Sequence, residues 1–247
     1  MALVHEWEKQ GNILFVNRSW IPAIFVLAGF GFLYFTDFKT IPESFSWAYI
    51  LFCSSFVFLG QFIRSFAVGF ADKNTSGRNT SDGQVADSIN KTGIYSLVRH
   101  PLYLGNYFQW LGALLFCGSW EFAFVSTLAY IIYYERIMFA EEQFLRKKFG
   151  QEYDLWSANT PAILPKLGGY TPSRNSFNWR DMVRREYLGF CAAFYVMSFY
   201  GAFSASIQAG TFAIDPIVLQ LFYVTFGFFI VIRILAKATK VLSPVSA

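Results

Sequence analysis

The chain has 247 residues, of which 55% are hydrophobic, 21% aromatic and only 15% charged. This composition excludes an ordinary soluble protein, because thirty Phe residues exceed what one soluble core uses and the apolar residues gather into spans between polar loops. The net charge of +4 then indicates how the chain is oriented in a membrane, and we predict no nucleic-acid partner.

The three cysteines, Cys53, Cys117 and Cys191, all lie inside apolar segments. A disulfide framework is therefore not expected, and none of the three has neighbouring His, Asp or Glu residues at metal-ligand spacing. We predict that they are small core residues and that the chain has no metal site.

The first third of the chain predicts a short arm and two membrane helices. Residues 1–18 mix charged residues with Trp, Leu and Phe, which favours an amphipathic helix at the membrane interface. A first span is expected over about 19–35 and a second over about 45–63, with the loop TDFKTIPES at 36–44. Residues 72–84, DKNTSGRNTSDGQ, have the composition of a mobile loop.

A third span over about 102–117 and a fourth over about 120–134 are joined by Gly118 and Ser119, which predicts a tight helical hairpin. The fourth helix is expected to continue beyond the membrane as YYERIMFAEEQFLRKKFG, because the helical periodicity persists while charge appears, and to end at Gly150. The following residues, 151–175, contain several Pro and Gly and are predicted to be irregular.

The last third of the chain predicts a basic segment before a fifth span over about 187–207, and a sixth span over about 216–235. The fold class is therefore an all-α polytopic membrane protein with about six transmembrane helices. We treat residues 1–247 as one integral membrane domain with three parts: an N-terminal part at 1–90, a motif core at 91–165 and a C-terminal part at 166–247.

The distribution of Lys and Arg residues predicts the orientation of these spans. In the six-span arrangement only Lys39 falls on one side, and the other 19 of the 20 basic residues fall on the opposite side. By the positive-inside rule, both termini and the polar motifs described next face the cytoplasm.

Arg99, His100 and Pro101 stand where a polar linker enters the third span. Pro fits the first turn of a helix, and the free N–H groups of that turn can bind an anionic ligand. Arg and His at this depth need a partner or a function, although a basic interfacial anchor would have the same composition.

Two motifs together resemble a known family. GIYSLVRHPLYLGNY is followed, after an apolar hairpin, by EEQFLRKKFGQEYDLW and a Pro-rich stretch. This order resembles the isoprenylcysteine carboxyl methyltransferases and related bacterial membrane methyltransferases, including phospholipid methyltransferases. The resemblance covers roughly residues 90–165 and implies a cytoplasmic pocket for S-adenosylmethionine between the Arg-His-Pro helix start and the charged helix extension.

The resemblance also implies roles for individual residues. Glu142 aligns with the glutamate before the family's Phe-Gly pair, and Arg99 would orient the acceptor or balance charge at the reacting centre, so both are candidate catalytic residues. The candidate cofactor-binding residues are Tyr95, Leu97, Val98, His100, Tyr103, Asn106, Glu141 and Glu142.

One departure from the family pattern bears on the acceptor. Prenylcysteine enzymes of this family carry an arginine where this chain has Asn159, so a carboxylate-orienting charge is missing. Arg180, Arg184 and Arg185 lie on the same side of the membrane, and Arg180 and Arg184 share a helix face. Guanidinium groups suit a phosphate by their fork geometry, so these three are candidate substrate-binding residues.

We therefore expect an enzyme that methylates a lipid phosphate, on lipid A or a phospholipid headgroup, in the bacterial inner membrane. Its expected partners are the membrane lipid substrate and the lipid bilayer. Three alternatives remain open: a prenylcysteine carboxyl methyltransferase, a sterol-reductase-like membrane reductase that uses NADPH, and a non-catalytic membrane scaffold.

Overall fold

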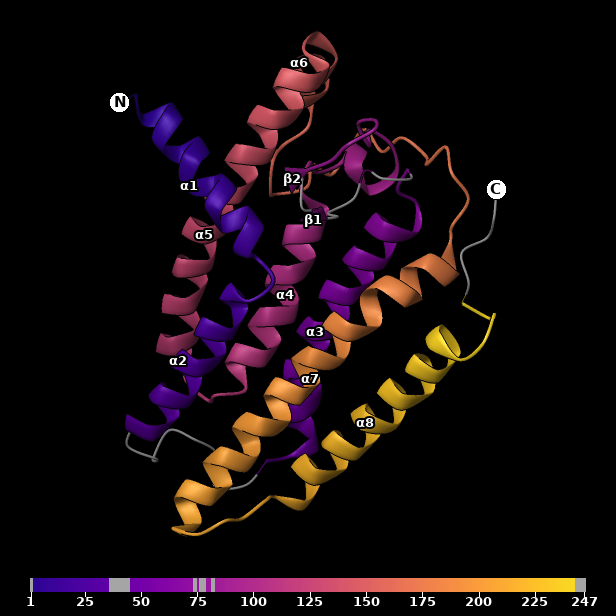
Figure 1. The fold of residues 1–247 in the computed structure, drawn as a ribbon. Helices are drawn as coiled ribbons and strands as arrows, with labels where there is room; N and C mark the ends of the chain where they lie inside the picture. The colour runs from indigo at the N-terminus through magenta and orange to yellow at the C-terminus, as the bar shows by residue number, and fades with distance from the viewer. Residues whose placement is uncertain (1, 36–44, 73–74, 76–78, 81–82, 243–247) are drawn as a thin grey trace.

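The computed structural model describes residues 2–35, 45–72, 75, 79–80 and 83–242, and within them the protein is almost entirely helical (Figure 1). The expected loop at 36–44 and parts of the expected loop at 72–84 lie outside the described residues. The elements in chain order are α1 (Leu3–Asn17), α2 (Ile21–Phe35), α3 (Trp47–Gly69), β1 (Asn79–Thr80), β2 (Gly83–Gln84), a 3-10 turn η2 (Gly93–Ser96), α4 (Pro101–Leu115), α5 (Trp120–Phe149), α6 (Gln151–Asn159), α7 (Trp179–Ala209) and α8 (Pro216–Lys237).

The all-helical membrane fold is confirmed, and a helix lies at each of the six expected places. Four of them, α3, α5, α7 and α8, are long and apolar enough to cross a membrane, and α1 with α2, bent by 79°, could form a fifth span. The count of six is not confirmed, because α4 has only 15 residues and is shorter than a helix that crosses a hydrocarbon layer of about 30 Å.

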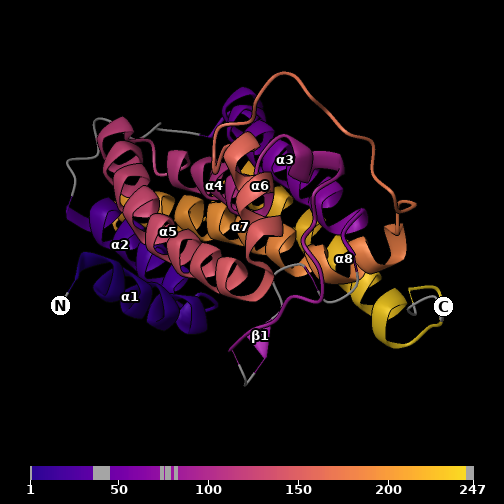
Figure 2. The same cartoon turned by 90° about the horizontal axis from the view of Figure 1, so that it is seen from above.

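The long helices form a bundle in which α3 packs against α4 and α7, α7 packs against α8, and α1 packs against α5. Helices α1 and α8 lie on opposite sides of this bundle (Figures 1 and 2). The β1–β2 hairpin, α1, α6 and the end of α5 gather at one end of the bundle in Figure 1. The core contains all three cysteines, which are free and buried, as the sequence predicted.

The predicted hairpin between α4 and α5 is confirmed. Gly118 has a φ of 76°, which allows a sharp reversal, and the side chain of Ser119 accepts a hydrogen bond from the backbone N–H of Phe122 at the start of α5. Helix α5 continues as predicted to Phe149 and ends at Gly150, whose φ is 52°. The charged residues of this extension therefore lie at the end of the bundle where the candidate motifs lie.

Two expectations about the flanking segments have different outcomes. The N-terminal arm is a helix, α1, and it lies along the charged half of α5, with the ring of Trp7 against Phe139 at 5.7 Å. The prediction of an irregular segment directly after Gly150 is wrong, because residues 151–159 form α6. These nine residues contain no Gly or Pro, and the first helix-breaking residue after Gly150 is Pro161.

Helices α3 and α4 approach each other so closely that their contact needs glycine. A Cβ atom on Gly60 would lie 2.4 Å from the backbone oxygen of Gly105, and one on Gly112 would lie 2.5 Å from the backbone oxygen of Cys53. Backbone atoms cannot move aside as a flexible side chain does, so these glycines set the distance between the two helices.

We expect Gly105→Ala to destabilise the protein, because the new methyl group would meet the backbone oxygen of Gly60 at 2.8 Å. Overpacking of this kind costs about 1–3 kcal/mol. The matched control is Gly227→Ala in α8, where a Cβ atom meets nothing within 4 Å, and this variant should unfold at the same or a slightly higher temperature. Thermal unfolding in detergent measures both, and equal midpoints for the two variants would contradict the close crossing.

Candidate active site

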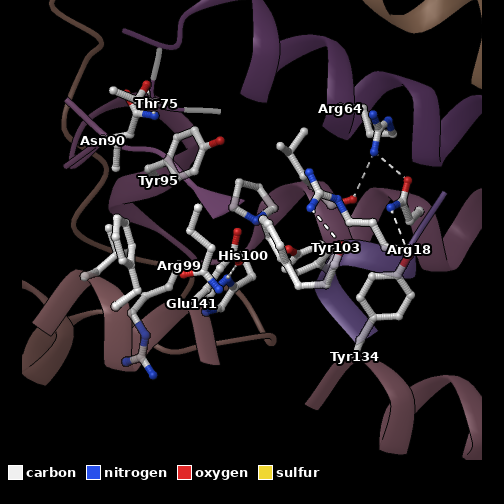
Figure 3. Close-up of a pocket in the computed structure, with 18 of the residues that line it drawn as sticks. Arg18, Arg64, Thr75, Asn90, Tyr95, Arg99, His100, Tyr103, Tyr134 and Glu141 are labelled. Carbon is white, nitrogen blue, oxygen red and sulfur yellow. Dashed lines mark hydrogen bonds and ion pairs between the residues drawn. The ribbon is translucent and has the colours of Figure 1, made fainter. Parts of the chain in front are cut away.

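A cavity of about 660 Å³ lies at the end of the bundle where the motifs gather (Figure 3). Its walls come from the inner end of α1, the polar linker after the β1–β2 hairpin, the start of α4, the extension of α5, and α6. The volume is typical of a site for a small molecule or cofactor. In Figure 3, Thr75, Asn90 and Tyr95 lie toward one end of the cavity, and Arg64 and Tyr134 lie toward the other.

The carboxylate of Glu142 joins the Arg-His-Pro motif to α5. The Nε–H of Arg99 donates to Glu142 Oε1 at 2.9 Å, and the Nε2 of His100 lies 2.9 Å from the same oxygen. An ionised carboxylate can only accept, so Nε2 of His100 carries its proton here. Because His100 is buried, this contact fixes both the tautomer and the orientation of the ring.

Arg99 also holds the chain that follows α6. Its Nη1 donates to the backbone oxygens of Ser157 at 2.9 Å and Thr160 at 2.7 Å. The backbone of the motif reinforces this contact, since the N–H of Arg99 donates to Pro161 and the N–H of His100 donates to Ala162. The Pro-rich segment is therefore attached to the start of α4 by both side-chain and backbone hydrogen bonds.

The neighbouring carboxylate, Glu141, has a different environment. It lines the cavity, and its Oε2 lies 3.6 Å from Nδ1 of His100. Successive residues of a helix point about 100° apart, so Glu141 can face the cavity while Glu142 faces Arg99. The structure thus separates a carboxylate available to a ligand from one that organises the motif.

Two aromatic side chains that carry polar groups, Tyr95 and Trp156, also line the cavity. Trp156 lines it, and its buried indole N–H has no hydrogen-bond acceptor among the described residues. Burial, and secondarily the carboxylate of Glu141, raises the pKa of Tyr95 well above its ordinary value. Tyr95 therefore keeps its hydroxyl proton at neutral pH and can donate a hydrogen bond to a bound molecule.

At the opposite end of the cavity, a buried polar network joins four helices. The guanidinium of Arg64 on α3 binds the buried carboxylate of Glu186 on α7, with Nη2 to Oε1 at 2.9 Å. Arg64 also donates to Asn106 Oδ1 on α4, and Asn106 Nδ2 donates to the hydroxyl of Tyr134 on α5 at 3.3 Å. Figure 3 labels Arg64 and Tyr134, which stand at the two ends of the part of this network that lines the cavity.

The predicted site residues fall into two groups. The cavity brings together Tyr95, Arg99, His100, Tyr103, Asn106 and Glu141. The predicted residues that do not line it are Leu97, Val98, Glu142, Arg180, Arg184 and Arg185.

The second group has other contacts. Val98 is fully buried, and the carbonyl of Leu97 accepts a hydrogen bond from the N–H of Lys166. Arg184 and Arg185 both bind Asp181, at 2.7 and 3.3 Å, near the start of α7. The predicted roles of these residues stay predictions.

Several cavity residues were not predicted. Phe15, Arg18, Arg64, Asn90 and Tyr134 lie outside the two motifs, and Trp156 is the last residue of the second motif. Arg18 and Arg64 each stand directly beside an expected apolar span. This position is also typical of a membrane anchor, so the sequence alone does not assign either residue to a site.

Comparison with known proteins now adds to this geometry. Residues 45–152 match the model of the phospholipid methyltransferase family. This segment is similar to that family, and the match covers less than half of the chain. It begins at the start of α3, earlier than the two motifs indicate, so the methyltransferase-family segment includes Arg64 as well as the Arg-His-Pro turn and Glu142.

Three relatives match over part of the chain. An isoprenylcysteine O-methyltransferase of Schizosaccharomyces pombe is 31% identical over 45% of this chain and 48% of the relative. A nickel-cobalt-cadmium resistance protein of Alcaligenes xylosoxydans, NccN, is 32% identical over 34% and 39%. A cobalt-zinc-cadmium resistance protein of Cupriavidus metallidurans, CzcN, is 33% identical over 36% and 40%.

The chain therefore matches half or less of the length of each of these relatives. The resemblance to isoprenylcysteine and phospholipid methyltransferases is confirmed at the level of the family. No solved structure matches the chain. The described residues hold no group of three or more His, Cys, Asp or Glu side chains arranged to bind a metal ion.

We expect Arg99→Gln to loosen the segment after α6 and to lower the thermal midpoint. It removes the charge that binds Glu142 and two carbonyl oxygens, and a hydrogen bond to a charged group contributes about 1.5–3 kcal/mol. Amide hydrogen exchange should accelerate over residues 157–166. Arg174→Gln, a change at an exposed arginine in the following loop, is the control and should leave both measurements unchanged.

Proposed function

We propose that this protein is an S-adenosylmethionine-dependent methyltransferase that acts on a membrane-anchored lipid acceptor. The observation that carries the proposal is the convergence of Arg99, His100 and Glu141, all within the methyltransferase-family segment, on one cavity at the end of a membrane-helix bundle. A soluble acceptor would not need such a position.

The groups around the cavity fit the donor molecule. The indole N–H of Trp156 is a buried donor with no acceptor among the described residues, as expected of a group that binds a ribose or adenine atom. Glu141 suits the ammonium of the donor, and the N–H groups in the first turn of α4 suit its carboxylate. When bound, the donor supplies a methyl group on a positively charged sulfur.

The residues of the chain then align and enclose the reactants. Methyl transfer to an anionic acceptor needs in-line alignment and exclusion of water more than a strong base. Glu142 holds Arg99 and His100 at the cavity wall, so we assign to these three the task of fixing the start of α4 and the segment after α6 around the donor.

A lipid phosphate, on lipid A or a phospholipid headgroup, is the preferred acceptor. The match to the phospholipid methyltransferase family supports this choice. The similarity to the isoprenylcysteine O-methyltransferase of S. pombe supports a second candidate, methylation of a prenylcysteine carboxylate. The family match favours either over a reductase or a non-catalytic scaffold.

The proposed location is the bacterial inner membrane, with both termini and the cavity on the cytoplasmic side. The clustering of 19 of the 20 basic residues on one side of the expected spans supports the orientation. Two of the relatives are bacterial proteins, which supports the assignment to a bacterial membrane.

Donor binding should depend on Glu141 and Trp156. We expect Glu141→Gln and Trp156→Phe each to weaken S-adenosylmethionine binding about tenfold, because each removes one hydrogen bond or ionic contact of about 1.4 kcal/mol. Trp179→Phe, outside the cavity at the start of α7, should bind normally. Isothermal titration of the purified protein gives the three affinities, and wild-type affinity in both cavity variants would refute this donor site.

The acceptor is identified by incubating the protein with methyl-labelled S-adenosylmethionine and membrane lipid extract, followed by mass spectrometry of labelled products. A labelled phosphate ester supports the preferred acceptor, and a labelled prenylcysteine ester replaces it with the second candidate. Thermal stabilisation by NADPH, with none by S-adenosylmethionine, would overturn the methyltransferase proposal in favour of the reductase.

A further inference from the structure

The cavity has a wall that the methyltransferase-family segment does not supply. Phe15, Arg18 and Pro22 line it from the junction of α1 and α2, and the family match begins only at residue 45. The 79° bend between α1 and α2 brings this junction to the cavity. The N-terminal arm thus adds a cationic side chain to a site that the family segment lines only in part.

Arg18 is held in place by an anchored neighbour. Phe15 is buried and packs into a cluster with Tyr130, Tyr134 and Ile137 of α5. The guanidinium of Arg18 lies 3.8 Å from the centre of the Phe15 ring, and its Nη1 donates to the Phe15 carbonyl at 3.1 Å. Stacking on a fixed ring limits the orientations of the guanidinium and so keeps its charge at one position in the cavity wall.

Two other arginines of the cavity wall are committed to structural contacts. Arg64 binds Glu186, and Arg99 binds Glu142, and neither of these carboxylates lines the cavity. These ion pairs hold helices together and contribute little net charge to the cavity.

The cavity wall also carries two side chains of opposite charge. Arg18 and Glu141 both line the cavity, so it presents one cationic and one anionic side chain to its contents. In the proposed function Glu141 binds the ammonium of the donor. An acceptor with a negatively charged oxygen group would then match Arg18.

The surroundings of Arg18 fit a lipid acceptor. Pro22, Trp110 and Leu188 line the same cavity and supply apolar surface for a hydrocarbon chain. Arg18 stands at the end of α1, which lies along the charged half of α5, and immediately before the apolar helix α2. We expect such a junction between a charged and an apolar segment at the level where a lipid headgroup meets its acyl chains.

We propose that Arg18 determines acceptor specificity by binding the anionic oxygen group of the membrane-anchored acceptor. The inference rests on the proposed function and names the residue that recognises the second substrate. In the reaction an acceptor oxygen forms a bond to the methyl carbon with its own electron pair, the carbon–sulfur bond breaks, and its electrons neutralise the sulfur. The acceptor loses one negative charge, so its attraction to Arg18 falls and the product is released.

A lipid phosphate and a prenylcysteine carboxylate both offer an anionic oxygen group to Arg18. The charge that remains on the methylated product distinguishes the two acceptors. A phosphate monoester keeps a negative charge after methylation, so its product should still compete for Arg18. A carboxylate becomes neutral, so its product should inhibit weakly.

The test uses the full chain in detergent micelles with two probes, a diacylglycerol phosphate and N-acetyl-S-farnesylcysteine. We expect Arg18→Gln to raise the KM of the methylated probe tenfold or more while the affinity for S-adenosylmethionine stays within about twofold. Arg18→Lys keeps the positive charge but loses the paired N–H donors of the guanidinium, so its KM should lie between those of the wild type and Arg18→Gln. Arg174→Gln is the control and should behave as the wild type.

The outcomes separate this inference from the proposed function. Wild-type transfer with an unchanged KM in Arg18→Gln overturns the role of Arg18 alone. Absence of both donor binding and transfer in the wild type overturns the proposed function and this inference with it. If Arg18→Gln loses donor binding through misfolding, the KM of Arg18→Lys decides, and a wild-type value overturns the inference. A wild type that binds the donor but methylates neither probe overturns recognition of these two anions.

Discussion

The contact of Glu142 with both Arg99 and His100 is the interaction on which the candidate site depends. One carboxylate oxygen on α5 accepts from two side chains at the start of α4, and Arg99 continues to the carbonyl oxygens of Ser157 and Thr160. The side chains are mostly buried, so the charges are poorly screened and each remaining group would be costly without its partner. Three segments that are far apart in the sequence are fixed together in this way, and the cavity lies beside them.

A second ionic contact, between Arg64 and Glu186, holds the opposite wall. It links α3 to α7 across 122 residues of sequence, and Asn106 extends it to α4 and α5. The glycines at the α3–α4 crossing allow the two helices to approach until Arg64 reaches Asn106. Helix packing between small residues and a buried polar network therefore support each other, as expected where no water is available to satisfy polar groups.

Patterns of neighbouring residues predicted the features that depend on neighbouring residues, namely the helices and the motif at the start of α4. Apolar runs located the helices, and the persistence of helical periodicity through the charged residues predicted α5 up to Gly150. The motif at the start of α4 identified His100, Tyr103 and Asn106, which lie on successive turns facing one cavity. Helix α6 was missed because the Pro and Gly residues beyond it dominated the interpretation, although 151–159 contains neither. Arg18 was missed because most of its neighbours in the cavity are distant in sequence, and spacing carries no information about such contacts.

Glu141 and Glu142 show why residue roles need the three-dimensional structure even when a motif is correctly located. Both are carboxylates, both belong to the same motif, and a resemblance favours Glu142 as the functional one. Their directions differ by about 100° around the helix, so the one that pairs with Arg99 is turned away from the cavity and the one that faces it is its neighbour. Glu142 does not line the cavity and so is not placed to bind a ligand's ammonium, whereas its neighbour Glu141 does line it. The functional importance of Glu142 is thus expected to lie in the position it gives to Arg99 and His100, and contact with a bound molecule falls to Glu141.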